Sequence, residues 1–317
     1  MENIRSLRIV FLGTPDFAVA SLEALHTAGF NIVGVVTAPD KPAGRGLQLQ
    51  QSAVKQYAVQ HQLPVLQPVK LKDPDFLAAL DEWNPDLQVV VAFRMLPEIV
   101  WNRPRLGTIN LHGSLLPQYR GAAPINWAII NGEKTTGVTT FLLQHAIDTG
   151  NILGQEQIPI EENEDAGSLY NRMKIIGAKL LVKTVEQYAA GTITPTPQEA
   201  KLSTSEKQLH HAPKIDKETG AIDWRKSATE INNLIRGLSP SPGAHTKFEG
   251  KMLKIYKAVA LHKNPTGVPG TTETDGKSHL HFNCGKEKLS ILELQLEGKK
   301  RMNVEEFLRG YRFNAGA

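Results

Sequence analysis

Short apolar runs alternate with helical patterns through the first half of the chain. Short runs rich in apolar residues predict strands over 7–12, 32–37, 87–93, 107–112, 137–143 and 155–160. Between these runs, helical spacing of apolar residues predicts helices over 17–28, 52–61, 73–83, 124–131 and 166–190. Nearly continuous apolar strands that alternate with helices are typical of a parallel, doubly wound sheet. We therefore predict an α/β first domain of Rossmann-like architecture.

The pattern changes after residue 190. Residues 191–205 contain Thr and Pro but no apolar period, which predicts a linker. Beyond it, one helix over 227–236 precedes short strands over 244–248, 253–260, 279–283 and 289–296, and Asn303 caps a last helix. A small barrel of mostly antiparallel strands, of the oligonucleotide-binding (OB-like) type, fits this pattern. We therefore expect a larger domain over 1–190, a linker over 191–205 and a smaller β-barrel domain over 206–317.

Composition narrows the class of protein. The chain has 317 residues, of which 41% are hydrophobic and 21% charged, as in ordinary globular proteins. No apolar run approaches the ~18 residues that a membrane helix needs, and the first residues do not resemble a targeting peptide. The single cysteine, Cys284, cannot form an intrachain disulfide, and we expect it to be a small strand hydrophobe. A reducing, cytoplasmic location follows.

Charge is distributed unevenly along the chain. Residues 1–205 hold 17 Lys and Arg against 19 Asp and Glu, a net charge of −2. Residues 206–317 hold 19 against 13, a net charge of +6. A basic second half indicates either a polyanionic partner or merely a soluble basic surface, and charge alone does not separate the two.

In a parallel sheet, ligands bind beyond the carboxyl ends of the strands. This rule places residues 13–16, 38–49, 93–97 and 110–117 on one rim. Gly13 follows the first strand but lacks the further glycines of a dinucleotide fingerprint, so we exclude NAD and assign Gly13 to a tight turn. The glycines around Arg45, in a loop with Lys41, do not form a phosphate-binding motif. By itself that loop is more typical of a solvent loop than of one that reaches a nucleic-acid backbone.

The strongest candidate site lies at the end of the fourth predicted strand. Asn110 and His112 are two residues apart, so their side chains share one face of that strand. Gly113 then allows a turn, and residues 114–117 place backbone polar groups beside two leucines, which suits a flat, partly polar heterocycle.

An amide and an imidazole at a strand end suit acyl transfer. The amide of Asn110 would donate to the oxygen that becomes negative, and His112 would donate to it or pass a proton. Asp148, in a later loop on the same rim, would favour the imidazolium and accept a proton from an attacking amine. Each residue has a structural alternative: Asn110 could close a turn, His112 could be a core histidine, and Asp148 could cap a turn. His210 and His211 lack further ligands, so we expect no metal site.

Several motifs resemble one enzyme family. The run from Asn110 to Pro117, the Arg120–Pro124 segment and Asp148-Thr-Gly150 are similar to the signature of the formyltransferases that use 10-formyltetrahydrofolate. The members of that family with this whole layout act on methionyl-tRNA. The resemblance extends along almost the full chain, through residues 11–18, 38–46, 212–215, 222–224 and 235–240.

The resemblance implies roles for individual residues. The catalytic residues would be Asn110, His112 and Asp148. Contacts to the folate would come from Ser114, Leu115, Leu116 and Pro117, and at the pterin end from Phe93, Arg94 and Met95. Lys41 and Arg45 would contact the acceptor end of the tRNA, which reverses the solvent-loop interpretation, and the basic C-terminal domain would hold the tRNA. Many members carry Tyr-Gly and one residue more where this chain has residues 93–96, so we expect the pterin pocket to differ there.

The predicted partners are therefore initiator methionyl-tRNA and the formyl donor 10-formyltetrahydrofolate, bound by a monomer without a metal. Three alternatives remain open at this stage. The acceptor could be another small amine, such as a sugar nucleotide or a purine precursor. The nucleophile could be water, which would make the protein a folate-site hydrolase. A third alternative is an RNA-binding module without catalysis.

Overall fold

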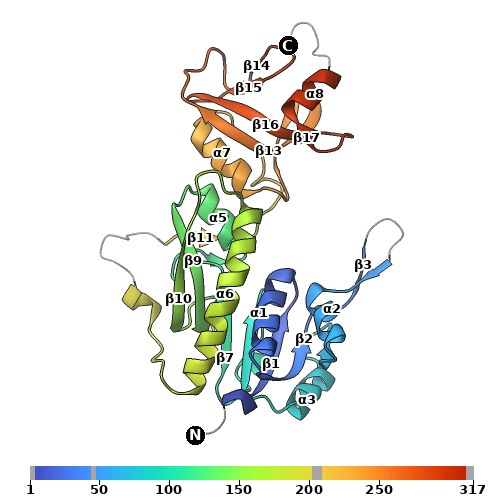
Figure 1. Cartoon of the computed structure of the whole chain (residues 1–317), viewed down its shortest axis with the longest axis vertical. Helices are drawn as coiled ribbons and strands as arrows, with labels where there is room; N and C mark the ends of the chain where they lie inside the picture. The colour runs from blue at the N-terminus through green and yellow to red at the C-terminus, as the bar shows by residue number, and fades with distance from the viewer. Residues whose placement is uncertain (1–3, 44–47, 202–208, 312–317) are drawn as a thin grey trace. The chain divides into compact units, whose positions relative to one another are not determined.

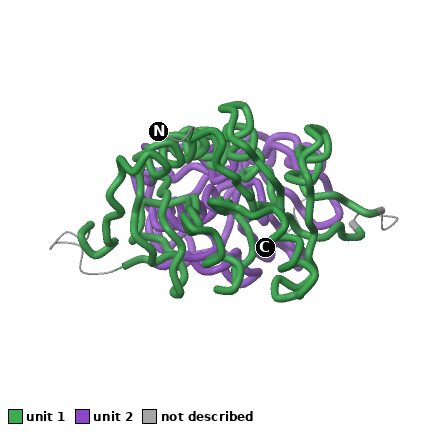
Figure 2. The backbone as a smooth tube through the Cα atoms, turned by 90° about the horizontal axis from the view of Figure 1, so that it is seen from below, with its two compact units in different colours: residues 1–120, 137–158, 170–210 green, residues 121–136, 159–169, 211–317 purple. Residues whose placement is uncertain are grey.

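The structure is a computed structural model that describes residues 4–43, 48–201 and 209–311. The chain forms two compact units (Figure 2). Unit 1 comprises residues 1–120, 137–158 and 170–210, and unit 2 comprises residues 121–136, 159–169 and 211–317. The functional domain limits expected from the sequence, 1–190 and 206–317, stay a prediction. Among the described helices, none combines the length and the apolar character that a membrane crossing requires.

The larger sheet contains seven strands in the order β10-β9-β7-β6-β1-β2-β5 (Figure 1). Strand β1 pairs in parallel with β2 and β6, β2 pairs in parallel with β5, and β6 pairs in parallel with β7. The predicted parallel, doubly wound sheet is thus confirmed. One pair of strands in this sheet is not parallel, since β9 pairs antiparallel to β7. The strand bounds are β1 (Arg8–Gly13), β2 (Asn31–Val36), β5 (Val65–Leu66), β6 (Leu87–Val91), β7 (Thr108–His112), β9 (Thr135–Leu142) and β10 (Ile152–Pro159).

Local sequence signals explain where the helices of this half begin. Ser52 caps α2 by accepting a hydrogen bond from the backbone N–H of Lys55, and Asp73 caps α3 with Pro74 at the first helical position. Apolar side chains from the strands and helices, such as Phe11, Leu22 and Leu80, are fully buried. The helices are α1 (Asp16–Thr27), α2 (Ala53–Gln60), α3 (Pro74–Glu82), α4 (Glu98–Trp101) and α6 (Ala166–Ala189), with a short 3-10 helix at Ile4–Ser6.

The predicted loop 38–49 contains a hairpin that the sequence pattern did not indicate. Strand β3 (Lys41–Ala43) pairs antiparallel with β4 (Gln48–Gln50). Both strands are three residues long, too short to produce a period of apolar positions. The predicted linker 191–205 also carries structure where it is described. Thr196 exchanges two backbone hydrogen bonds of 2.8 Å with Ile152, and a 3-10 helix follows at Gln198–Lys201.

Unit 2 contains an antiparallel, curled half-barrel in the strand order β12-β13-β16-β15-β14, with β17 paired to β16. This confirms the expected smaller β domain. Its core is apolar, and Trp224 stacks on the buried Phe282 with ring centroids 4.2 Å apart. A capping box between Ser227 and Glu230 starts α7. The elements are α5 (Pro124–Ile130), α7 (Ala228–Gly237), β12 (Ala244–Phe248), β13 (Lys251–Leu261), β14 (Thr272–Thr274), β15 (Leu280–Asn283), β16 (Lys288–Leu296), β17 (Met302–Asn303) and α8 (Val304–Gly310), and short strands β8 (Arg120–Gly121) and β11 (His211–Ala212) also occur.

Candidate active site

The end of β7 carries the two polar residues that the sequence singled out. Asn110 pairs with Val90 of β6 and Phe141 of β9, and His112 lies two residues further on the same face. His112 is buried, whereas Asn110 is half-buried. Within the described residues, the carboxamide of Asn110 makes no side-chain hydrogen bond, so its N–H groups are available to a ligand.

The two ring nitrogens of His112 face different groups. Nε2 lies 2.9 Å from the backbone oxygen of Tyr119. Because a carbonyl oxygen can only accept, Nε2 carries the proton in this contact. Nδ1 lies 3.9 Å from Oδ2 of Asp148, which is an ion-pair distance but longer than a hydrogen bond. The structure therefore brings together His112 and Asp148, which lie 36 positions apart in the chain, and leaves Nδ1 as the nitrogen that can act on a substrate.

The loop that carries Asp148 is fixed at several points. Asp148 has a positive φ of 54°, a left-handed conformation that most side chains avoid. At Gly150 a Cβ atom would lie 1.6 Å from the backbone oxygen of Leu142, so only glycine fits there. The carboxamide of Gln198 donates hydrogen bonds of 2.8 Å to the backbone oxygens of both Asp148 and Gly150. The sequence did not single out Gln198, because one glutamine in a segment without an apolar period gives no signal.

The segment Ser114–Pro117 uses most of its polar groups internally. The hydroxyl of Thr139 donates to the backbone oxygen of Ser114 (2.6 Å) and accepts from the N–H of Leu116 (3.1 Å). Gln155 donates to the backbone oxygen of Leu116 (2.9 Å), and the hydroxyl of Ser114 donates to the backbone oxygen of Gln118 (2.6 Å). The expected row of free backbone polar groups is therefore largely occupied. Leu116 and Pro117 are buried and Leu115 is half-buried, so the segment packs mainly into the protein, and its contact with folate stays a prediction.

The three residues expected at the pterin end differ in exposure. Phe93 is half-buried and packs against the apolar cluster around Val90, whereas Arg94 and Met95 are exposed. The guanidinium of Arg94 donates to the backbone oxygens of Pro68 and Val69 (2.8 Å for Val69). This side chain therefore ties two loops of unit 1 together, and its own role toward folate stays a prediction.

The base of the β3–β4 hairpin is anchored by a carboxylate. Asp40 forms an ion pair with Lys55 (2.5 Å) and accepts a hydrogen bond from Gln67 (2.8 Å), which also binds the backbone oxygen of Ala38. The hydrogen bond from Lys55 holds the pKa of the Asp40 carboxyl below its ordinary value. Lys41 begins β3 and is exposed, and Arg45 lies outside the described residues. The hairpin thus projects from a fixed base, and tRNA contact by Lys41 and Arg45 stays a prediction.

Other candidate groups have structural explanations. Cys284 is buried in the apolar core of unit 2, and burial raises the pKa of its thiol to about 11. His210 and His211 are exposed. Within the described ranges, no group of three or more His, Cys, Asp or Glu side chains is placed to hold a metal ion.

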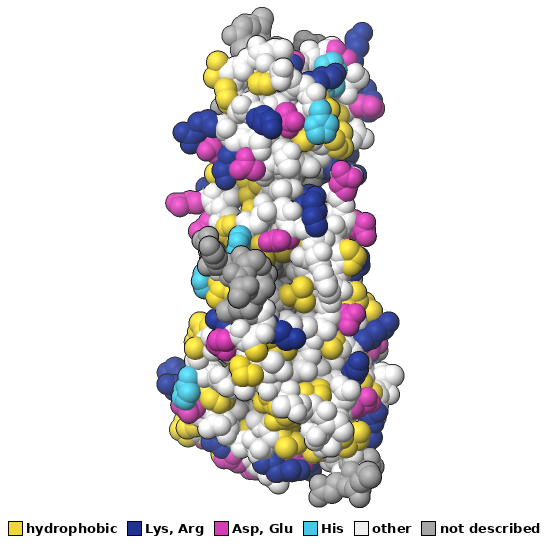
Figure 3. All heavy atoms as spheres, turned by 90° about the vertical axis from the view of Figure 1, so that its left-hand side faces the viewer, with side chains coloured by type: hydrophobic (Ala, Val, Ile, Leu, Met, Phe, Trp, Pro, Cys, Tyr) yellow, Lys and Arg dark blue, Asp and Glu magenta, His cyan; other side chains and the backbone are white. Residues whose placement is uncertain are grey.

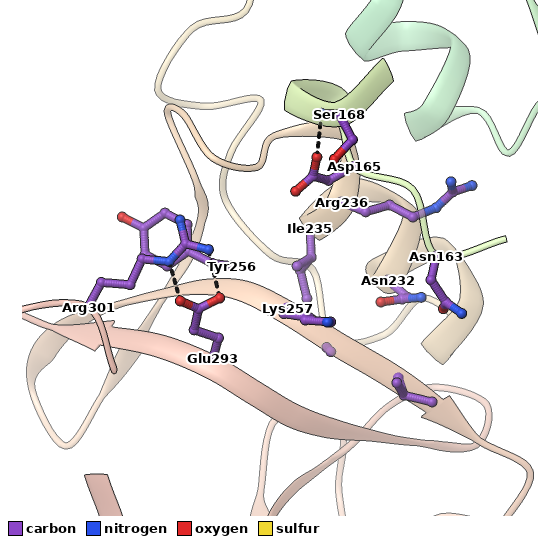
Figure 4. A pocket seen from close by; sticks show the side chains of 12 residues that line it. Asn163, Asp165, Ser168, Asn232, Ile235, Arg236, Tyr256, Lys257, Glu293 and Arg301 are labelled. Carbon is purple, nitrogen blue, oxygen red and sulfur yellow. Dashed lines mark hydrogen bonds and ion pairs between the residues drawn. The ribbon is translucent and has the colours of Figure 1, made fainter. Parts of the chain in front are cut away.

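Unit 2 has a pocket of about 420 Å³ that the sequence did not indicate (Figure 4). Its charged side chains are mostly engaged. Arg301 forms two hydrogen bonds with Glu293, and Arg236 donates to the backbone oxygen of Glu164. Over the face drawn in Figure 3, Lys and Arg side chains stand among Asp and Glu side chains and do not merge into one patch. The pocket is also lined by the polar side chains of Asn163, Asn232 and Lys257.

Comparison with known proteins agrees with this arrangement. Residues 7–185 match the family model described as formyl transferase, and residues 214–312 match the model described as formyl transferase, C-terminal domain. Two relatives carry the name methionyl-tRNA formyltransferase. The one from Bacteroides fragilis is 51% identical, over 96% of this chain and 95% of its own, and the one from Azobacteroides pseudotrichonymphae is 53% identical over the same shares. An N-formyltransferase from Helicobacter canadensis, solved with folinic acid and dTDP-3-aminofucose, shares the fold. Its TM-score is 0.64 and its identity 21%, covering 90% of this chain and 98% of that one.

Proposed function

Since this chain belongs to the formyl transferase family, we propose that it transfers a formyl group from 10-formyltetrahydrofolate to the α-amino group of methionyl-tRNA. The products are tetrahydrofolate and N-formylmethionyl-tRNA, the initiator form used to begin translation. Identities of 51% and 53% to methionyl-tRNA formyltransferases, over nearly the whole chain, support this acceptor. The enzyme is a one-carbon group transferase, and it acts in the cytoplasm, where charged tRNA is used. We expect it to act as a monomer.

The proposed chemistry rests on two side chains at the end of β7. The carboxamide of Asn110 makes no hydrogen bond within the described residues, and the imidazole of His112 is held through Nε2 by the backbone oxygen of Tyr119. The lone pair of the amine attacks the formyl carbon, and the carbonyl electrons move to the oxygen. Asn110 donates to that oxygen, and removal of such a donor reduces rates by ~100- to 1000-fold. Nε2 of His112 is held by the backbone oxygen of Tyr119, so Nδ1 is the second donor when His112 is an imidazolium, the form that the nearby Asp148 carboxylate favours.

Proton movement completes the transfer. The attacking α-amine must be uncharged, and an α-amino group has a lower pKa than a lysine side chain, so a strong base is not needed. Asp148 accepts the proton that the amine releases, since its carboxylate lies 3.9 Å from Nδ1 of His112. The oxyanion electrons then re-form the carbonyl as the bond between the formyl carbon and N10 of the folate breaks; N10 takes up one proton, which balances the one that the amine released, and Asp148 returns to its carboxylate form. The folate lies beside the Ser114–Pro117 segment, where Leu115 is the half-buried apolar side chain.

The tRNA is held through charge. The hairpin that carries Lys41 and Arg45 reaches the acceptor end, and the second half of the chain supplies its net charge of +6. The Helicobacter canadensis enzyme makes an amino sugar the alternative acceptor, because it has the same fold. That enzyme is only 21% identical to this chain, whereas the methionyl-tRNA formyltransferase from Bacteroides fragilis is 51% identical. Methionyl-tRNA is therefore the favoured acceptor.

A donor labelled in the formyl group tests the proposal. The enzyme is incubated with labelled 10-formyltetrahydrofolate and with methionyl-tRNA, with a dTDP-3-amino sugar, or with no acceptor. We expect label on the α-amine of methionyl-tRNA and little release of formate without acceptor. Label on the sugar would assign the alternative acceptor, and rapid formate release without acceptor would make the protein a hydrolase. Tight tRNA binding without any transfer would leave only an RNA-binding module.

A further inference from the structure

The groups on either side of His112 are connected to one another through side chains. The backbone oxygen of Tyr119 contacts Nε2 of His112, and Asp148 faces Nδ1. The next residue, Arg120, donates two hydrogen bonds from its guanidinium to Oε1 of Gln198, at 3.1 and 2.6 Å. Gln198 in turn donates to the backbone oxygen of Asp148. A closed ring of contacts therefore runs from one side of the imidazole to the other.

Gln198 occupies the centre of this ring. It is fully buried, and both ends of its carboxamide are used, by Arg120 at the oxygen and by Asp148 and Gly150 at the nitrogen. A buried amide that binds three partners defines their separation closely, because the loss of any one leaves a polar group without water or a partner. The adjacent backbone bonds between Thr196 and Ile152 hold the glutamine itself in place.

We propose that Gln198 is a positioning residue for formyl transfer, which sets the distance between the Asp148 carboxylate and His112 and links it to the Tyr119 segment. This inference rests on the proposed function of the same site. Gln198 touches neither the imidazole nor the carboxylate, so it acts through the backbone of Asp148 and not on the substrate. Its effect should therefore fall on turnover and leave substrate binding nearly unchanged.

The first test replaces Gln198 with methionine, which has similar length but no hydrogen-bonding amide. A displacement of about 1 Å in a catalytic group can reduce rates by ~100-fold, so we expect kcat to fall by ~10- to 100-fold. The KM values for 10-formyltetrahydrofolate and methionyl-tRNA should stay within about threefold, since the substrate contacts are intact. The matched control is Gln88→Met, because Gln88 is also fully buried in unit 1 but bonds to Thr108 in the sheet.

A double-mutant cycle separates positioning from general destabilisation. In an Asp148→Asn background, the change of Gln198 to methionine should cost less than about threefold in single-turnover rate, because the carboxylate it positions is gone. Arg120→Met breaks the same ring elsewhere and should lower kcat in the same direction, which keeps the test available if the Gln198 variant does not fold.

Three outcomes would overturn the inference. One is a folded Gln198→Met enzyme with the kcat of the parent. Another is a double variant, Asp148→Asn with Gln198→Met, whose loss of single-turnover rate equals the product of the two single losses. The third is an equal fall in kcat for Gln88→Met at matched thermal stability. The parent enzyme serves as the reference throughout: absence of formylation in the parent would refute the proposed function, whereas an active parent with unaffected variants would refute only the role of Gln198.

Discussion

The two units bury different kinds of side chain. In unit 1, the buried polar residues His112, Ser114, Thr139 and Gln198 each bind a backbone oxygen close to the candidate site. In unit 2, the core cluster is apolar; three charged side chains, Glu164, Arg236 and Lys288, are buried, and most of the others lie at the surface. A reaction that stabilises a transient oxyanion needs donors held in fixed places, whereas attraction of a polyanion needs only charge on a stable frame. We therefore propose that unit 1 carries out the chemistry and that unit 2 supplies charge for tRNA binding.

Removal of either hydrogen-bond donor at the end of β7 should reduce turnover more than any other change. Asn110→Ala and His112→Ala should each lower kcat by ~100- to 1000-fold, because each removes a donor to the developing oxyanion. Thermal stability should change little for Asn110, whose carboxamide has no protein partner among the described residues. The exposed Asn102 at the end of α4 gives the control, as Asn102→Ala should leave kcat unchanged. Turnover of His112→Ala within about tenfold of the parent would remove it from the mechanism.

A smaller effect is expected from moving the loop behind the donors. Gly150→Ala would place a Cβ atom 1.6 Å from the backbone oxygen of Leu142, so the loop that carries Asp148 must shift. We expect kcat to fall by up to ~100-fold with the KM for folate little changed. Gly310→Ala is the matched control, because a Cβ atom there meets nothing within 4 Å. Equal kinetics for Gly150→Ala and the parent would show that the position of this loop does not matter.

Removal of a positive charge from the hairpin or from unit 2 should have a smaller effect. It should weaken tRNA binding and leave the chemical step unchanged. Arg45→Ala, and separately Lys257→Ala on the exposed part of β13, should weaken tRNA binding. Each should reduce the slope of log Kd against log salt concentration by about one, while kcat at saturating tRNA stays constant. Binding is measured by titration at several salt concentrations. A variant whose tRNA affinity matches the parent at every salt concentration would exclude that residue from the interface.

The smallest effect concerns an ion pair in unit 2. A hydrogen bond from Lys288 (2.7 Å) lowers the pKa of Glu273 to about 2, from an ordinary value of 4.5. Because the folded pKa is depressed, the pair stabilises the fold above pH 4.5, and this contribution is lost as the pH falls toward 2. Glu273→Gln should therefore lower Tm above pH 4.5, with the difference from the parent vanishing at lower pH. A difference in Tm that is constant across this range would contradict the assignment.

Much of the fold followed from local pattern. Apolar runs located the parallel strands, and the rule for their carboxyl ends placed Asn110 and His112 at the site. The short β3 and β4 strands and the antiparallel pairing of β9 gave no such signal, since three-residue strands have no period and apolar runs carry no direction. Asp148 was identified through its loop and the family resemblance. Gln198 was missed because its partners lie 50 and 78 positions away, and only the folded chain brings them together.

We propose that the site at the end of β7 formylates methionine on its initiator tRNA. The most direct measurement is the rate of formyl transfer from labelled 10-formyltetrahydrofolate to initiator methionyl-tRNA, compared with elongator methionyl-tRNA and with a dTDP-3-amino sugar under the same conditions. We predict that initiator methionyl-tRNA is formylated fastest and that Asn110→Ala lowers this rate by ~100- to 1000-fold. Faster formylation of the amino sugar, or transfer that survives Asn110→Ala unchanged, would contradict the account.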